Sequence, residues 1–281
     1  MGFFFTVLTT IFLLKAGVES VTQSSGDKIG VVEIFGVITT PEKVIDALKQ
    51  FKKNDQVKAV VLRIDSPGGA VGASQEIYQE AKRLDRIKPV VASFGNTAAS
   101  GGYYSAMGAR YIVANPGTVT GSIGVIMKLP NVQKLLERLG IKTTVIKSGK
   151  LKDLASITRE LSPEERAVLK SVMDDIHKQF IQAVASSRHL SMEKVTALAD
   201  GRIFSGEQAK ELGLLDELGN FSVALDKAAK LAGIEGQWEV LYPKKDKISA
   251  LREILEESGA RTLANLVDLV VQKNSVYVVP E

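Results

Sequence analysis

The most constraining feature of this sequence is its alternation of short β-branched apolar segments with longer segments of helical periodicity. In chain order, strands and helices are expected at 28–38, 41–53, 57–64, 71–84, 88–94, from about residue 99 onward, and at 111–114. Strands that alternate with helices build a parallel sheet that the helices cover. The pattern therefore predicts an α/β fold with a largely parallel, buried sheet.

The second half of the chain is expected to be mostly helical. A further helix–strand pair is expected at 131–139 and 143–146, a long helix at 162–188, a turn at 212–218, a helix at 221–231 and an edge strand at 238–241. Ser162 and Glu165 form a capping box with Pro163 at the first helical position. The amphipathic tail 248–271 is expected to be an assembly element or a plain terminal helix.

Composition narrows the chemistry and the partners that this chain can have. There are no cysteines, which excludes disulfides, thiol nucleophiles and thiolate metal sites. His177 and His189 are the only histidines, and His177 lies beside the apolar stripe of a predicted helix, where a structural role is expected. The net charge is +4, with lysines and glutamates interleaved, so no nucleic-acid partner is expected.

The N-terminus begins with an uncharged apolar run. Gly2–Leu14 is too short on its own to cross a bilayer, but the run approaches a full span when it is extended to Val18. A cleaved signal peptide has an apolar region of the same length, and a buried core helix is the third interpretation. We expect a membrane anchor or signal segment at 1–18 and a linker at 19–27.

Three glycine-rich segments follow predicted strands, where open α/β sheets usually carry their sites. The first, 65–69 (DSPGG), brings two adjacent glycines close to a substrate, and their N–H groups are suited to a developing oxyanion. A simple strand-to-helix turn explains the glycines equally well. The third, 117–125, contains Thr120 and Ser122, uncharged hydroxyls that are able to orient a neutral amine; a polar turn is the alternative.

The second glycine-rich segment, 96–104 (NTAASGGYY), holds a candidate nucleophile. Ser100 is flanked by small residues at an expected helix start, where the helix dipole favours negative charge. A serine nucleophile needs a base, and with both histidines unpromising the remaining candidate is a lysine held neutral by burial. Lys147, Lys150 and Lys152 all follow one short predicted strand, and their spacing does not choose among them.

Taken together, five segments resemble the signal peptide peptidase A family of serine proteases, in the family's order and approximate spacing. They are DSPGG, NTAASGGYY, TGSIGV, IKSGKLKDL and GRIFSGEQAKELGLLDELG, and they span about residues 28–219. The resemblance is to the short form of the family, which has one catalytic unit. It implies a crotonase/Clp-protease-like fold of repeated ββα units and a mostly parallel sheet.

The resemblance also assigns roles to residues. It implies that Ser100 is the nucleophile, that Lys152 is the general base and that Ser122 orients the lysine. Gly68 and Gly69 match the oxyanion segment, together with the Ser100 N–H, and Gly101 joins them in substrate binding. No metal and no cofactor is implied. Whether Ser100 meets the Lys152 of its own chain or that of a neighbour stays open.

For the whole protein, the resemblance implies a serine endopeptidase that cleaves apolar, membrane-associated peptides such as remnants of signal peptides. The catalytic domain is expected at 28–235, with an edge strand and helical assembly element at 236–281. A ring-shaped homo-oligomer is expected in a bacterial cell membrane, with one N-terminal anchor and the catalytic domain on the extracytoplasmic side. The alternatives are a crotonase-type acyl-CoA enzyme and an inactive membrane scaffold of the same fold.

Overall fold

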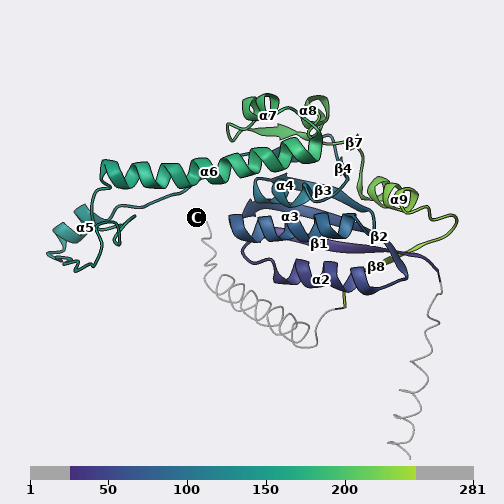
Figure 1. Ribbon diagram of the computed structural model, residues 1–281, viewed down its shortest axis with the longest axis horizontal. Coiled ribbons are helices and arrows are strands. Elements are labelled where there is room, and N and C mark those ends of the chain that lie inside the picture. Colours follow the sequence, from purple (N-terminus) through teal and green to yellow (C-terminus); the bar gives the residue numbers. More distant parts are fainter. Residues whose placement is uncertain (1–25, 245–281) are drawn as a thin grey trace, which may run out of the picture. The chain divides into compact units, whose positions relative to one another are not determined.

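The structure, a computed structural model, describes residues 26–244 of the chain (Figure 1). The chain divides into a unit at 1–241 and a second unit at 242–281, of which only residues 242–244 are described. The predicted segment 1–18, residues 19–25 of the predicted linker 19–27 and the tail 248–271 therefore lie outside the described residues.

One mostly parallel sheet organises the described part of the first unit. Its strands are β1 (Lys28–Ile38), β2 (Val57–Gly69), β3 (Val90–Ala99), β4 (Tyr111–Ala114), β5 (Val119–Gly121), β6 (Ile203–Ser205), β7 (Glu217–Leu218) and β8 (Glu239–Leu241). The order is β6-β5-β3-β2-β1-β8, and β4 pairs with both β3 and β7. Among the described pairs only β5 and β6 run antiparallel. The predicted α/β class with a mostly parallel sheet is confirmed.

Helices cover the sheet on both faces (Figure 1). They are α2 (Glu42–Lys53), α3 (Val71–Asp85), α4 (Gly101–Ala106), α5 (Gln133–Arg138), α6 (Pro163–Arg188), α7 (Met192–Leu198), α8 (Gly206–Leu212) and α9 (Phe221–Leu231). Alternate residues of each strand serve opposite cores. Val32 and Leu62 pack with α2, α3 and α4, whereas Val31 and Val61 pack with α9.

The long helix and the edge strand agree with expectation. Ser162 caps α6, its hydroxyl accepts from Glu165 N, and the Glu165 carboxylate accepts from Ser162 N in return. β8 pairs with β1 at the edge of the sheet, as expected for 238–241.

Two expectations are wrong. Residues 143–146 form no strand, because they are exposed and have no neighbouring strand with which to pair. The strands expected at 57–64 and 88–94 end later than predicted: β2 continues through Gly69 and β3 through Ala99. Each is extended by a strand partner, since Gly68 pairs with Val37 and Thr97 pairs with Val119.

The expected location, a bacterial cell membrane reached through one N-terminal anchor, is contradicted. Within residues 26–244 no helix combines the length and the apolar character that a bilayer crossing demands. Helix α6, with 26 residues, is long enough but carries charged side chains such as Glu164, Lys170 and Asp174. The segment 1–18, on which the expectation rested, lies outside the described residues.

An ion pair between a buried arginine and a partly exposed aspartate fastens the C-terminal end of α6 to the sheet. The Arg188 guanidinium is almost fully buried and donates two hydrogen bonds of 2.7 Å to the Asp216 carboxylate. Asp216 also accepts the Ile112 N–H at 2.8 Å, so one carboxylate joins α6 to β4. Such a pair is costly to break from one side, because the remaining charge is left buried and unpaired.

We expect Asp216→Ala to lower the free energy of unfolding by about 3 kcal/mol, since it strands the Arg188 guanidinium and the Ile112 N–H. Urea denaturation measures this change. Asp226→Ala, at an exposed position on α9, is the control and should stay within about 0.5 kcal/mol of the parent. Equal stabilities for the two variants would contradict the role of the pair.

Candidate active site

Ser100 occupies the junction between β3 and α4 in a conformation that few residues adopt. Its φ is +50° and its ψ is −122°. Two backbone hydrogen bonds hold it there: Ser100 N donates to Gly121 O at 2.9 Å, and Tyr104 N donates to Ser100 O at 2.8 Å. Backbone strain of this kind persists only where the surroundings enforce it, and it concentrates at functional sites.

The end of β2 approaches this junction so closely that only glycine fits. A Cβ on Gly68 would lie 2.6 Å from Gly101 N and 2.9 Å from Ala99 O, and the Gly68 φ is +101°. A Cβ on Gly101 would lie 3.1 Å from Gly69 N. The structure therefore brings Gly68, Gly69, Ser100 and Gly101 together.

Two of the expected oxyanion donors already have acceptors within the protein. Ser100 N donates to Gly121 O, and Gly68 N donates to the Ser66 hydroxyl at 3.1 Å. Gly101 is the first residue of α4, so its N–H has no acceptor inside the helix. The Gly101 N–H is thus the better candidate to face an oxyanion, and Gly69 N lies 3.1 Å from the Cβ position of Gly101.

Ser122 lies next to Gly121, the residue that accepts the Ser100 N–H. Its own φ is +50°, and its N–H donates to Arg202 O at 2.8 Å. The preceding residues are fastened along β3, because the Thr120 hydroxyl donates to Ala98 O at 2.7 Å. Ser122 therefore directly follows Gly121, the residue whose carbonyl oxygen binds the Ser100 N–H, and its loop is held in place at that point.

A small cavity of about 20 Å³ opens beside Ser100. Its walls are mostly apolar or small: Gly69, Val71, Ser74, Gly101, Tyr104, Gly124, Val125, Ile176 and Phe180. The Tyr104 and Phe180 rings pack with centroids 4.6 Å apart. Ser74, Ile176 and Phe180 are not among the expected site residues, because helical periodicity alone does not tell which core positions face a site.

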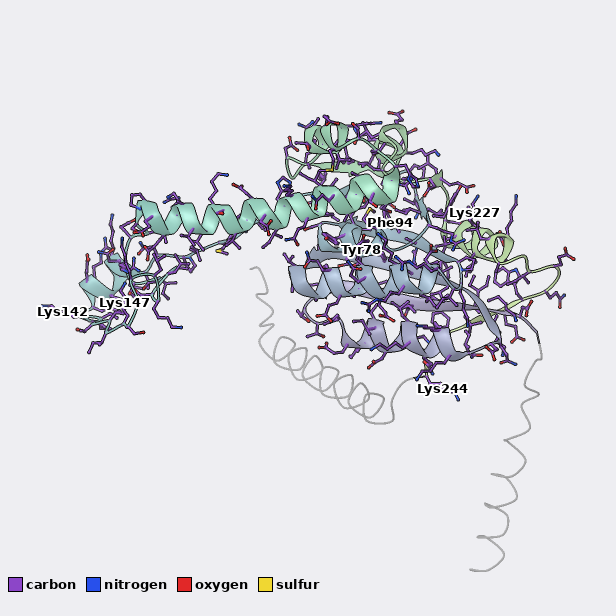
Figure 2. All side chains as sticks on the ribbon, in the orientation of Figure 1. Tyr78, Phe94, Lys142, Lys147, Lys227 and Lys244 are labelled. Carbon is purple, nitrogen blue, oxygen red and sulfur yellow. The ribbon has the colours of Figure 1, made fainter. Side chains whose placement is uncertain are left out.

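No lysine lines this cavity among the residues that the structure describes. Lys152 instead lies in the segment 126–161, which we call the arm and which contains α5. None of the arm's residues is buried. Figure 2 shows Lys142 and Lys147 near α5, away from Tyr78 on α3 and Phe94 on β3.

The arm is fastened to the N-terminal end of α6. Lys150 forms an ion pair with Glu164, and Arg159 donates to Asp153 at 2.8 Å and to Glu165 at 2.6 Å. Ile176, which lines the Ser100 cavity, lies eleven residues further along α6 than Glu165. At a rise of about 1.5 Å per residue this is a separation of roughly 17 Å. Within one chain, then, the structure does not bring Lys152 and Ser100 together.

The Arg159 network perturbs the titration of its members. Hydrogen bonds from Arg159, and then from the Ser162 backbone, lower the pKa of Glu165 to about 2. The Glu165 and Asp153 carboxylates raise the pKa of Arg159 in return. This network joins Asp153, the residue after Lys152, to the first turn of α6.

Comparison with known proteins identifies the family of this chain. The model of peptidase family S49 matches residues 82–235, more than half of the chain. The chain belongs to peptidase family S49. The predicted resemblance to the signal peptide peptidase A family is confirmed at this level, and the activity of the S49 chain is that of a protease.

Individual relatives extend the match over most of this S49 chain. A Synechocystis sp. protein named as a protease is 50% identical over 249 residues, which cover 88% of this chain and 90% of that one. An Enterococcus faecium protein named as a signal peptide peptidase is 36% identical over 80% of this chain and 71% of that one.

A solved structure gives the fold comparison for this S49 chain. A mutant of the 1510-N membrane-bound stomatin-specific protease superposes with a TM-score of 0.50 at 16% identity, covering 79% of this chain and all of that one. This likeness concerns the fold alone, and it agrees with the predicted α/β class with a mostly parallel sheet.

We expect Gly68→Ala to reduce peptide cleavage by roughly 100-fold, because the new Cβ pushes Gly101 N away and misaligns the oxyanion donors. The rate of hydrolysis of a fluorogenic peptide measures this loss, with thermal melting as the check on folding. Gly72→Ala is the matched control, since nothing lies within 4 Å of its Cβ position and its φ is ordinary. Full activity in Gly68→Ala would contradict the assignment.

The arm should detach in acid. Because the pKa of Glu165 is lowered from 4.5 to about 2, its ionised form stabilises the anchored arm fully above about pH 4.5, and this stabilisation is lost as the pH falls toward 2. Hydrogen exchange at 153–165, corrected for intrinsic rates, should rise across that window. Glu165→Gln should exchange fast already at pH 7, whereas Glu160→Gln, with an exposed side chain outside the Arg159 network, should resemble the parent.

Proposed function

We propose that this S49 peptidase is a serine endopeptidase in which Ser100 is the nucleophile and Lys152 the general base. The observation that carries the proposal is the strained Ser100 junction, held against Gly68 and Gly101 and opening onto a small cavity. The membership in a peptidase family makes a crotonase-type acyl-CoA activity the weaker alternative.

The proposed reaction follows from these positions. Ser100 Oγ attacks the carbonyl carbon of the scissile bond and passes its proton to the neutral Nζ of Lys152. The oxygen that becomes negative accepts hydrogen bonds from the N–H groups of Gly69 and Gly101. The C–N bond then breaks, and Lys152 protonates the leaving amine. A water molecule hydrolyses the acyl-serine ester with the same base, and Ser122 orients the lysine through its hydroxyl.

We propose further that the lysine comes from a second copy of the chain. The support is the location of Lys152 on the arm, at the far end of α6 from the Ser100 cavity. Exposed apolar side chains on the arm are also consistent with burial against another copy: Ile126, Leu135, Leu139 and Ile141 are each more than half exposed. A closed ring supplies each Ser100 with a neighbour's Lys152.

The proposed substrates are peptides that carry a small or apolar residue before the scissile bond. The cavity beside Ser100 is small, and Val71, Val125 and Ile176 give it apolar walls. Remnants of signal peptides are rich in such residues, and one relative is named as a signal peptide peptidase. The proposed substrate class is therefore apolar peptides such as these remnants.

We expect Ser100→Ala and Lys152→Ala to be inactive separately and active together. In a ring assembled from equal amounts of the two chains, about one quarter of the positions pair an intact serine with a neighbour's intact lysine, so about one quarter of the parent activity should return. Co-expression followed by a fluorogenic peptide assay measures this recovery.

The control replaces Lys152→Ala by the double variant Ser100→Ala/Lys152→Ala, which cannot complement Ser100→Ala. Labelling with a serine-directed fluorophosphonate should disappear in Ser100→Ala. Absence of recovery in well-assembled mixtures would refute the sharing of the site, and normal cleavage by Ser100→Ala alone would refute the proposed nucleophile.

A further inference from the structure

The ladder between β2 and β3 is interrupted just before the candidate active site. Ile64 pairs with Phe94, but the next pair is Ser66 with Ala98. Three residues of β3, Gly95 to Thr97, therefore lie opposite the single residue Asp65. An irregularity of this kind leaves backbone groups without their ladder partners and loosens the coupling between two strands.

The Asp65 side chain bridges this interruption. Its Oδ1 accepts the Thr97 N–H at 3.0 Å, and its Oδ2 accepts the Asn96 side-chain N–H at 2.7 Å. Gly95 allows the approach, because a Cβ there would lie 2.8 Å from Asp65 Oδ2. The carboxylate thus replaces the missing backbone bonds between β2 and β3.

The bridge lies between the two halves of the candidate site. Asp65 precedes Gly68 by three residues on β2, and Thr97 precedes Ser100 by three residues on β3. Asp65 does not line the Ser100 cavity. A loss of the bridge therefore moves the oxyanion donors relative to the nucleophile without removing any group that touches substrate.

We propose that Asp65 is a positioning residue that sets the spacing between the Gly68–Gly69 segment and Ser100 by binding Asn96 and Thr97. The inference rests on the proposed serine-protease function. It requires the two hydrogen bonds that join the side chain at position 65 to the Thr97 N–H and to the Asn96 side chain, rather than its negative charge. This requirement separates the role from a general electrostatic one.

The first experiment compares Asp65→Ala with Asp65→Asn. Asp65→Ala removes both acceptors, so kcat for a fluorogenic peptide should fall by at least about tenfold while KM changes less than threefold. Asp65→Asn keeps one oxygen for the Thr97 N–H, and the exposed Asn96 amide can turn to offer its own oxygen. This variant should retain kcat within about threefold.

The matched control is Asp85→Ala at the opposite end of β3. The Asp85 carboxylate accepts the Val90 N–H at 2.9 Å and pairs with Arg110, which is the same kind of contact away from the site. It should lower the melting temperature as Asp65→Ala does but leave kcat within about threefold. Parent kcat in folded Asp65→Ala, or equal loss of kcat in Asp65→Ala and Asp85→Ala, would overturn the proposal.

A charge-swap cycle tests the contact itself. Asn96→Asp sets two carboxylates against each other and should lower kcat severalfold, whereas Asp65→Asn/Asn96→Asp restores a donor–acceptor pair and should recover most of it. No recovery in the double variant would count against the bridge. Ser100→Ala is assayed in the same series. Peptide cleavage by Ser100→Ala would contradict the proposed nucleophile. An inactive Ser100→Ala together with a fully active Asp65→Ala would contradict only the positioning role of Asp65.

Discussion

The candidate site depends on one close backbone approach, that of the end of β2 to the β3–α4 junction. Gly68 and Gly101 lie too close for a side chain on either, and Ser100 is held with a positive φ between Gly121 and Tyr104. The parallel sheet makes this approach possible, because neighbouring parallel strands deliver their carboxyl ends to one edge. The core beneath, on both faces of the sheet, keeps that edge rigid.

Much of the fold could be predicted from periodicity, because buried positions carry apolar residues at the spacing of a strand or a helix. The β1 and β3 strands are apolar runs, and the α6 cap at Ser162 has a local chemical signature. The exact ends of β2 and β3 could not be predicted. Whether glycine-rich residues continue a strand is decided by partners such as Val37 and Val119, which lie elsewhere in the chain.

The residues of the candidate site also fall into those that could be predicted from the sequence and those that could not. Local chemistry marked Ser100 and the glycines around it, and the structure brings Gly68, Gly69 and Gly101 to it. The cavity walls at Ser74 and Phe180 could not be predicted, because they come from helix faces whose orientation is a tertiary property. The base was ambiguous for a related reason: within residues 26–244 no lysine of the same chain lines the Ser100 cavity.

The arm, without a single buried residue between 126 and 161, has a consequence for the life of the protein. In the proposed arrangement, a newly synthesised monomer has no complete active site, because its Ser100 and its Lys152 each need a second chain. Proteolysis then requires assembly of the subunits, and dilution that dissociates the oligomer abolishes it. The cell would be protected from a loose protease by mass action, without an inhibitor or a propeptide.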